Sequence, residues 1–228
     1  MINSSIKSQN PLMDYQKYIY DSLAVINDKD GFTNVREEPD INSKIIFQIN
    51  SNYIFKIIPN NENNWWKIEN IASRQEGYMH SNKIRNLGSL LILEQKELSI
   101  HILDSILNLK QNRGLYTDYD YHMIFKDYYH FQLFPVLNLV SKYYCYTQDK
   151  DFLNYYLNFM MEVKGTAWEA TLEALYYIFI CKTDEVITEL IKRSNYEKEY
   201  FINILEWEIG SDPNEVELLK KLELIREE

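Results

Sequence analysis

Glycine is scarce in this chain, with six residues among 228. Phosphate-binding loops and dinucleotide-binding fingerprints both need several glycines at fixed spacing, and neither pattern is present. The sequence also lacks an unbroken apolar run of about 18 residues, the length that a membrane-spanning helix needs. These absences argue against a nucleotide-binding enzyme, and we expect no cofactor and no membrane partner.

Cysteine is rarer still, with only Cys145 and Cys181, and both stand in apolar segments with helical spacing. We predict two free thiols that pack as small hydrophobic side chains rather than a disulfide, because nothing in the sequence indicates an oxidising compartment. The first 14 residues are polar and lack the apolar stretch of about 7–15 residues found in secretory signals. We therefore expect a cytoplasmic protein, unless an export signal was removed before the first residue.

The histidines are few and scattered, and no Cys or Glu accompanies them at the spacing of metal ligands. We predict no metal site. His80 is expected to cap a one-turn helix that begins at Ser81. An enzyme would need a deep pocket in the second half of the chain that gathers His122, His130 and nearby carboxylates, and we do not predict one.

Charge is distributed unevenly along the chain. Up to Gly88 there are 10 Lys and Arg against 10 Asp and Glu, whereas from Ser89 onward there are 14 against 24, so the second half carries the whole net charge of -10. An acidic field repels nucleic acid and attracts a basic partner. The predicted acidic interaction surface, which is alternatively only a solvated face, consists of Glu162, Glu169, Glu173, Glu185 and Glu189.

The residue pattern changes character near Gly88. Before it, short stretches rich in β-branched and aromatic residues alternate with turn signals, which predicts a small barrel of five or six strands. After it, apolar residues recur every three or four positions, which predicts seven or eight helices. Helices of about 10–15 residues are too short to be stable alone, so we expect a helical bundle or a HEAT-like stack of helix pairs. The predicted organisation is a lead-in at residues 1–20, a barrel at residues 21–87 and an acidic helical domain at residues 90–228.

Local signals predict where individual helices begin. Pro135 lacks a backbone N–H and should kink or restart the helix that contains it. Thr166 and Glu169, like Ser194 and Glu197, have the spacing of a capping box, in which each side chain bonds the other residue's amide. Each of four tyrosine doublets should bury one ring and leave the other at the rim: Tyr128–Tyr129, Tyr143–Tyr144, Tyr155–Tyr156 and Tyr176–Tyr177.

Three short segments stand out in the first half: Asn34-Val35-Arg36-Glu37-Glu38-Pro39, Asn63-Asn64-Trp65-Trp66-Lys67-Ile68 and Glu76-Gly77-Tyr78-Met79-His80-Ser81. In their order and spacing they resemble the bacterial SH3 domain family. The resemblance covers roughly residues 23–87 and implies a noncatalytic module that binds cell-wall peptides or protein segments. In eukaryotic relatives the first Trp of such a pair lies on the ligand groove, which implies that role for Trp65.

Strand alternation agrees with this assignment. If Trp66 and Ile68 face the core, then Trp65 and Lys67 face outward. An exposed indole offers a large flat surface with one hydrogen-bond donor, which suits stacking on proline or a sugar. The alternative is that Trp65 packs under the loop at residues 60–64 or against the helical half. The predicted ligand-binding residues are Tyr53, Trp65, Lys67 and Tyr78.

Together these patterns predict a noncatalytic interaction protein whose partner is a protein or peptide, and the acidic half would suit a basic one. One alternative is an immunity protein that neutralises a basic bacterial toxin with its acidic half. Another, which requires export, is a cell-wall-binding protein. The oligomeric state is left open.

Overall fold

The structure is a computed structural model that describes residues 21–164, 169–210 and 216–227. The chain forms two compact units that divide between Leu91 and Ile92. The predicted lead-in at residues 1–20 and the predicted cap at Thr166 lie outside the described residues. The predicted fold class, an SH3-like β unit followed by an all-α unit, is confirmed.

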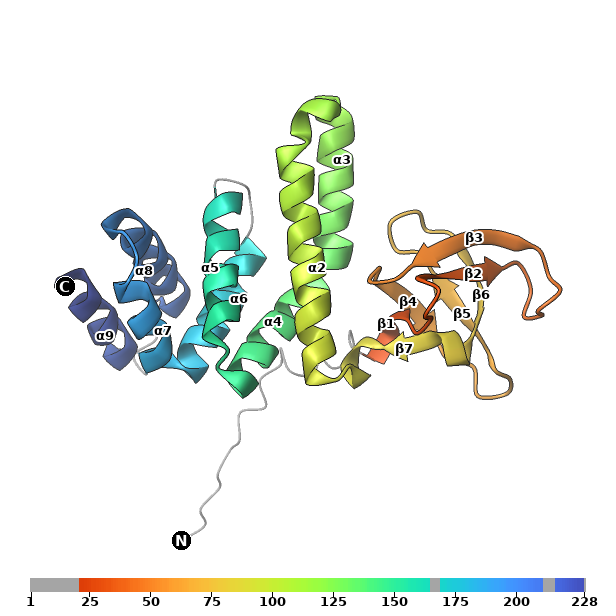
Figure 1. Cartoon of the computed structure of the whole chain (residues 1–228), viewed down its shortest axis with the longest axis horizontal. Helices are drawn as coiled ribbons and strands as arrows, with labels where there is room; N and C mark the ends of the chain where they lie inside the picture. The colour runs from red at the N-terminus through yellow and green to blue at the C-terminus, as the bar shows by residue number, and fades with distance from the viewer. Residues whose placement is uncertain (1–20, 165–168, 211–215, 228) are drawn as a thin grey trace, which may run out of the picture. The chain divides into compact units, whose positions relative to one another are not determined.

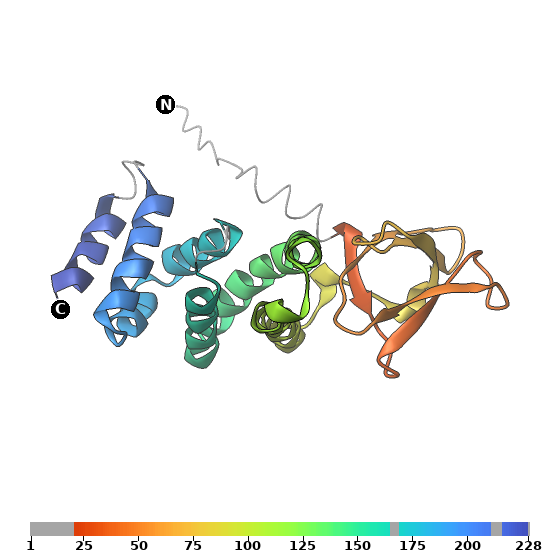
Figure 2. The same cartoon turned by 90° about the horizontal axis from the view of Figure 1, so that it is seen from above.

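The first unit, called the barrel unit below, contains seven short strands in one antiparallel sheet of order β3-β2-β6-β5-β4-β1-β7. The sheet curls round on itself (Figure 2), although no hydrogen bonds join its end strands β3 and β7 in the described residues. The strands are β1 (Leu23–Ile26), β2 (Phe32–Arg36), β3 (Ile45–Asn50), β4 (Phe55–Ile58), β5 (Trp65–Glu69), β6 (Glu76–His80) and β7 (Ile84–Asn86).

The core of the barrel unit is formed by the side chains that point inward at every second position of the strands. Val35, Ile68 and Met79 are fully buried and belong to one apolar cluster, against which Trp66 also packs. At Gly77, β6 passes so close to β2 that an added Cβ would lie 2.7 Å from the Arg36 carbonyl oxygen. Because that neighbour is backbone and cannot rotate away, only glycine fits at this crossing.

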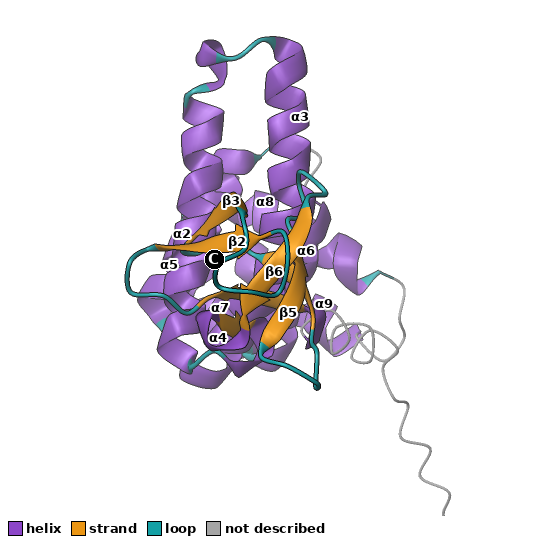
Figure 3. Cartoon of the chain, turned by 90° about the vertical axis from the view of Figure 1, so that its right-hand side faces the viewer, coloured by secondary structure: helices purple, strands orange, loops and turns teal. Residues whose placement is uncertain are grey.

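The second unit, called the helical unit, contains eight α-helices in its described residues. They are α2 (Ile92–Gln111), α3 (Asp118–Tyr128), α4 (Phe134–Thr147), α5 (Lys150–Val163), α6 (Glu169–Cys181), α7 (Thr183–Ile191), α8 (Asn195–Ile209) and α9 (Val216–Glu227). Helices two apart in sequence pack side by side, so α2, α4, α6 and α8 form a row (Figure 1). Figure 3 distinguishes these helices from the strands by colour.

The interruption predicted at Pro135 is confirmed, and it takes a specific form. Tyr129–Leu133 is a π-helical turn, η4, and α4 starts directly after it with Pro135 in its first turn. A proline ring clashes with the carbonyl four residues earlier and cannot donate to it. The wider turn accommodates this missing bond without ending the helical path.

Asp149 ties three helices of the helical unit together. It caps α5 by accepting from the Phe152 amide, and its other carboxylate oxygen accepts from Lys96 of α2 at 2.6 Å and from the Tyr143 hydroxyl of α4 at 2.7 Å. Burial alone would raise the pKa of Asp149, but the bonds from Lys96, Tyr143 and the Phe152 amide outweigh it and lower the pKa to about 2.

A second network of polar side chains lies at the start of α8. The capping box predicted for Ser194 and Glu197 is confirmed, with both reciprocal bonds present. Arg193, whose side chain is 9% exposed, donates to Glu197 and also to Asn154 and Asn158 of α5. The cap that starts α8 is thereby joined to α5.

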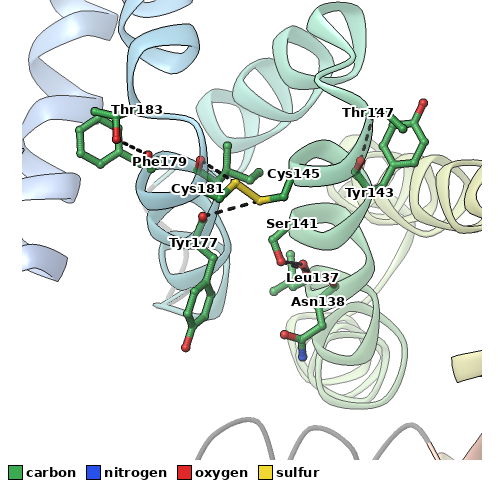
Figure 4. Close-up of a disulfide and its surroundings, with 11 residues drawn as sticks. Leu137, Asn138, Ser141, Tyr143, Cys145, Thr147, Tyr177, Phe179, Cys181 and Thr183 are labelled. Atoms are coloured by element: carbon green, nitrogen blue, oxygen red, sulfur yellow. Dashed lines mark hydrogen bonds between the residues drawn. A yellow bond between two sulfur atoms is a disulfide. The ribbon is translucent and has the colours of Figure 1, made fainter. Parts of the chain in front are cut away.

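The prediction of free cysteine thiols is wrong. Cys145 in the last turn of α4 and Cys181 at the end of α6 form a disulfide, with their Cα atoms 6.0 Å apart (Figure 4). The expectation rested on apolar sequence neighbours, yet Cys181 is exposed and Cys145 is half-buried. The pairing arises because α4 and α6 are neighbours in the row, a contact between segments 36 residues apart that the local pattern does not reveal.

Candidate functional site

One groove on the barrel unit brings together side chains from several strands and loops. Its volume is about 840 Å³. It is formed by the β1–β2 turn, β2, the β2–β3 loop, the facing ends of β5 and β6, and the one-turn helix η1 (Ser81–Lys83). The lining residues are Asp28, Asp30, Phe32, Thr33, Asn34, Arg36, Pro39, Asp40, Ile41, Trp65, His80, Asn82 and Lys83.

Trp65 lines this groove and is half-buried. Its neighbour Trp66 packs against the barrel core, so the predicted alternation of the two indoles is present. The Trp65 ring meets the edge of the His80 imidazole, with 5.4 Å between ring centroids and 82° between planes. This edge-to-face contact supports one side of the indole and leaves it facing the groove.

His80 has the capping role expected for it and also lines the groove. Its side chain accepts a hydrogen bond from the Asn82 amide at the start of η1. One residue therefore both ends β6 and braces Trp65, so the indole is positioned by the local fold before any ligand arrives.

Two apolar side chains extend the surface offered by Trp65. Phe32 is 41% exposed and Ile41 is 65% exposed, and both line the groove. The β2–β3 loop that carries Ile41 is folded by its own bonds, including Arg36 to the Ser43 carbonyl at 2.6 Å and the Glu38 amide to the Ser43 hydroxyl at 2.9 Å. The apolar rim is therefore held on an ordered loop.

Charged groups of both signs flank the apolar surface. Lys83 pairs with Asp28 at 2.8 Å, and the Thr33 hydroxyl also donates to that carboxylate. The bond from Lys83 lowers the pKa of Asp28 below its usual value. The carboxylates of Asp30 and Asp40 are exposed at the groove. The groove can therefore offer apolar contact, hydrogen bonds and ionic contact at once.

The other three predicted ligand-binding residues do not line this groove. Tyr53 packs against the barrel core, and its hydroxyl donates to the Asn70 side chain. Lys67 makes an ion pair with Glu76 at 2.6 Å, and Tyr78 lies beside Lys67 in the β5–β6 register. The structure thus groups Trp65 with residues that the sequence pattern did not single out.

The predicted acidic surface is only partly available. Glu162 is exposed, and Glu173 and Glu185 are half-buried, whereas the side chain of Glu169 lies outside the described residues. Glu189 needs correction, because it is 4% exposed and is bonded to Lys192 and Asn154. It points between helices because it falls on the inner face of α7, next to Leu190, and so it cannot present its charge to a partner.

The described residues of the helical unit show no group of three or more His, Cys, Asp or Glu that would hold a metal ion. Of the two histidines that an active site would have used, His122 is exposed on α3, and the side chain of His130 lies outside the described part of the chain. None of the described helices combines the length and apolar character needed to cross a bilayer.

Comparison with known families adds one finding to this geometry. The model of the bacterial SH3 domain family matches residues 31–84. The resemblance seen in the sequence is confirmed over this range, which contains the whole lining of the groove except Asp28 and Asp30. Bacterial SH3 domains are generally binding modules for proteins or cell walls. No curated protein matches the chain.

Phe32 and Ile41 are the two exposed apolar groove residues that the sequence analysis did not name, among other lining residues that it also missed. Phe32 carried a usable signal, because it alternates with buried Thr33 and Val35 along β2 and must face outward, as Trp65 does. Ile41 carried none, since it lies in a loop whose path depends on the bonds to Ser43.

Proposed function

We propose that the protein is a noncatalytic interaction protein whose bacterial SH3 domain binds an extended segment of a protein or peptide in the Trp65 groove. The observation that carries this proposal is the half-buried indole of Trp65, braced by His80 and continued by the apolar side chains of Phe32 and Ile41. A flat ring held in place loses little conformational entropy when a ligand stacks on it.

The dimensions of the groove support a peptide rather than a folded surface. A volume of about 840 Å³ lies within the range of about 300–1,000 Å³ typical of sites for small ligands and short segments. Mixed apolar and charged lining suits a chain of alternating side chains, some of which stack on the indole while others reach Asp30 or Asp40.

A display library of linear peptides, selected on the full chain, tests the proposal. Peptides that bind wild type should lose at least about tenfold in affinity with Trp65→Ala, because buried aromatic anchors contribute about 2 kcal/mol or more. Trp207→Ala is the matched control, since Trp207 on α8 is 67% exposed and far from β5 in sequence. Equal binding by the two variants, or a selection that enriches nothing, would contradict the proposal.

The disulfide favours a second candidate, binding to the peptide part of a bacterial cell wall. Disulfides persist in oxidising surroundings and are rare in the reducing cytosol. The Cys145–Cys181 disulfide therefore favours a location outside the cytoplasm, whereas the sequence led us to expect a cytoplasmic protein. Co-sedimentation of the full chain with purified cell-wall sacculi tests this candidate. The candidate is supported if wild type sediments with the sacculi and Trp65→Ala does not. It is rejected if wild type stays in the supernatant.

The acidity of the helical unit supports the immunity-protein alternative less directly. The net charge of -10 falls in the second half of the chain, and Glu162 is exposed there. A basic toxin held by this charge should dissociate as salt rises, because the screening length falls from about 10 Å at 0.1 M to about 3 Å at 1 M. A partner held mainly by stacking on Trp65 should lose less affinity over the same change, because salt does not screen that apolar contact.

A further inference from the structure

We propose that the Cys145–Cys181 disulfide is a reducible staple, which sets how firmly α6 is held to α4 according to the redox state of the surroundings. The bridge joins two helices that already pack side by side in the row (Figure 4). It therefore adjusts an existing contact rather than creating one. The proposal concerns the helical unit and does not rest on the function of the groove.

The bridge is open to reductants. Cys181 is exposed and Cys145 is half-buried, and their chain neighbours Ile180 and Tyr146 are 42% and 77% exposed. Because Cys181 is exposed as a residue, we expect a small thiol to reach its sulfur without prior unfolding of the helices. Solvent-exposed disulfides are typically the labile and regulatory ones, whereas buried structural bridges resist reduction.

Both redox states fit the local structure. The Cys145 sulfur lies 3.9 Å from the Tyr177 carbonyl oxygen, and the Cys181 sulfur lies 3.2 Å from the Ile178 carbonyl oxygen. In the disulfide the sulfurs have no proton to donate, but after reduction each thiol has an acceptor within reach. Reduction thus leaves no polar group stranded between α4 and α6.

The two sulfurs are poorly placed for catalysis of thiol exchange. Reactive dithiols favour the thiolate, which is stabilised at helix N-termini and in Cys-x-x-Cys motifs. Here both cysteines lie in the final turns of their helices, where the partial charge is negative and opposes a thiolate. With a sequence separation of 36 residues, the pair serves as a link between segments and not as an oxidoreductase site.

Reduction by a dithiol reagent is a balanced two-electron exchange. A reagent thiolate attacks the Cys181 sulfur, the bond between the two protein sulfurs breaks, and Cys145 leaves as a thiolate that takes up a proton. The second thiol of the reagent loses its proton and attacks the other reagent sulfur, which is bonded to Cys181 in the mixed disulfide. This step releases Cys181, which is protonated in turn, and the reagent ends as a cyclic disulfide.

The reduced helical unit should be loosened rather than unfolded. α6 keeps an apolar face with Leu175, Ile178 and Phe179 fully buried, and these contacts do not depend on the bridge. Local opening is governed by the contacts and cross-links that hold a segment. The effect of reduction should therefore be largest in α6 and in the helices that follow it.

Hydrogen exchange of the native full chain, read by mass spectrometry, tests the staple. Oxidised protein should show no titratable thiol, and dithiothreitol without denaturant should release two. Reduction should speed amide exchange in residues 169–181 at least about tenfold and leave residues 31–84 unchanged. A Cys145→Ser, Cys181→Ser double variant should resemble the reduced protein in either buffer.

Several results would overturn the proposal. Two reactive thiols in protein kept under oxidising conditions would show that the bridge does not form. Equal exchange in the oxidised and reduced protein would show that the bridge holds nothing. Acceleration of residues 31–84 to the same extent, or a response of the double variant to dithiothreitol, would show that the reagent acts elsewhere. Because the main comparison uses wild type in two redox states, it does not depend on how well the variant folds.

Discussion

The barrel unit and the helical unit achieve specificity by different means. In the barrel unit, strand alternation and one close backbone crossing at Gly77 determine which side chains face the groove. In the helical unit, polar groups such as Asp149 and Arg193 join helices that are distant in sequence, and a disulfide adds a covalent link. One unit is organised by backbone geometry, and the other by side-chain connections between helices.

This difference has consequences for how the two units respond to change. The backbone geometry that places Trp65 does not depend on pH or redox state, so the indole should keep its position over a wide range of conditions, although the Lys83–Asp28 pair in the groove wall does depend on charge. Ion-pair and disulfide links depend on protons and electrons, so the helical unit should be the part that responds to its surroundings. Four substitutions probe this contrast.

The largest effect is expected from Gly77→Ala. The added methyl would lie 2.6 Å from Val35 Cγ1 and 2.7 Å from the Arg36 carbonyl oxygen, so β2 and β6 would have to separate. We expect a loss of about 3 kcal/mol in the free energy of unfolding of the barrel unit. Hydrogen exchange in residues 31–84 measures it.

Gly114→Ala is the matched control, because nothing lies within 4 Å of its added methyl. It should leave the barrel unit unchanged. If Gly77→Ala accelerates exchange in the helical unit as much as in the barrel unit, the two units do not respond separately and the comparison fails.

A smaller effect, and one that depends on pH, is expected at Asp149. Its pKa of about 2 in the folded protein lies below the unfolded value of 3.8, so its stabilising contribution is fully present above pH 4 and is lost as pH falls toward 2. The contribution is at most about 2.5 kcal/mol. Asp149→Asn should destabilise the helical unit at pH 7 by up to this amount and flatten its pH dependence between pH 4 and 2, as measured by urea unfolding.

Asp151→Asn provides the comparison for that experiment. Asp151 lies in the same first turn of α5 but is exposed. The variant should lose much less stability than Asp149→Asn, because Asp151 has neither the bond from Lys96 nor the bond from Tyr143. If both variants lost the same free energy of unfolding, the negative charge in the first turn of α5, and not the bonds from Lys96 and Tyr143, would stabilise the unit.

A loss of about 1 kcal/mol is expected from Ser194→Ala, which removes the side-chain half of the capping box that starts α8. Glu197→Gln keeps an oxygen that can accept from the Ser194 amide and should cost less. Thermal unfolding of both variants gives the difference. The opposite order would show that the charge of Glu197 toward Arg193 matters more than the cap.

The smallest effect is expected from Lys67→Ala in the barrel unit. Its ion pair with Glu76 joins side chains that are 39% and 51% exposed, so water and salt screen it and its loss should change the free energy of unfolding very little. Peptide binding should also be unchanged, because Lys67 does not line the groove. A tenfold loss of affinity would return Lys67 to the binding site and redraw its limits.

Much of the barrel unit was predictable because its rules are local. The period of two along β5 placed Trp65 and Trp66 on opposite faces, and the indole of Trp65 does line the groove. The sequence did not show which side chains share the groove with Trp65, and Tyr53, Lys67 and Tyr78 do not line it. Tyr53 and Tyr78 are aromatic and lie on or beside strands. Whether they reach the groove depends on how the whole sheet curves, and the residue pattern of one strand does not predict that curvature.

The helical unit was predictable at helix starts and interruptions, at Pro135 and Ser194, where the cause is local. It was not predictable where helices meet. The rule of one buried ring per tyrosine doublet fails at Tyr143–Tyr144, since α4 packs between α2 and α6 and both rings are buried. The same double-sided packing of α4 places Cys145 against α6.

The π-helical turn at Tyr129–Leu133 also changes the direction in which the side chains of α4 point. One extra residue in a helical turn rotates the downstream side chains by about 100°. A single-residue deletion there would restore uniform winding and swing Cys145 away from Cys181, so the chemical bond between α4 and α6 depends on an irregularity three helical turns upstream. The irregular turn next to Pro135 thus affects whether the two cysteine sulfurs can meet.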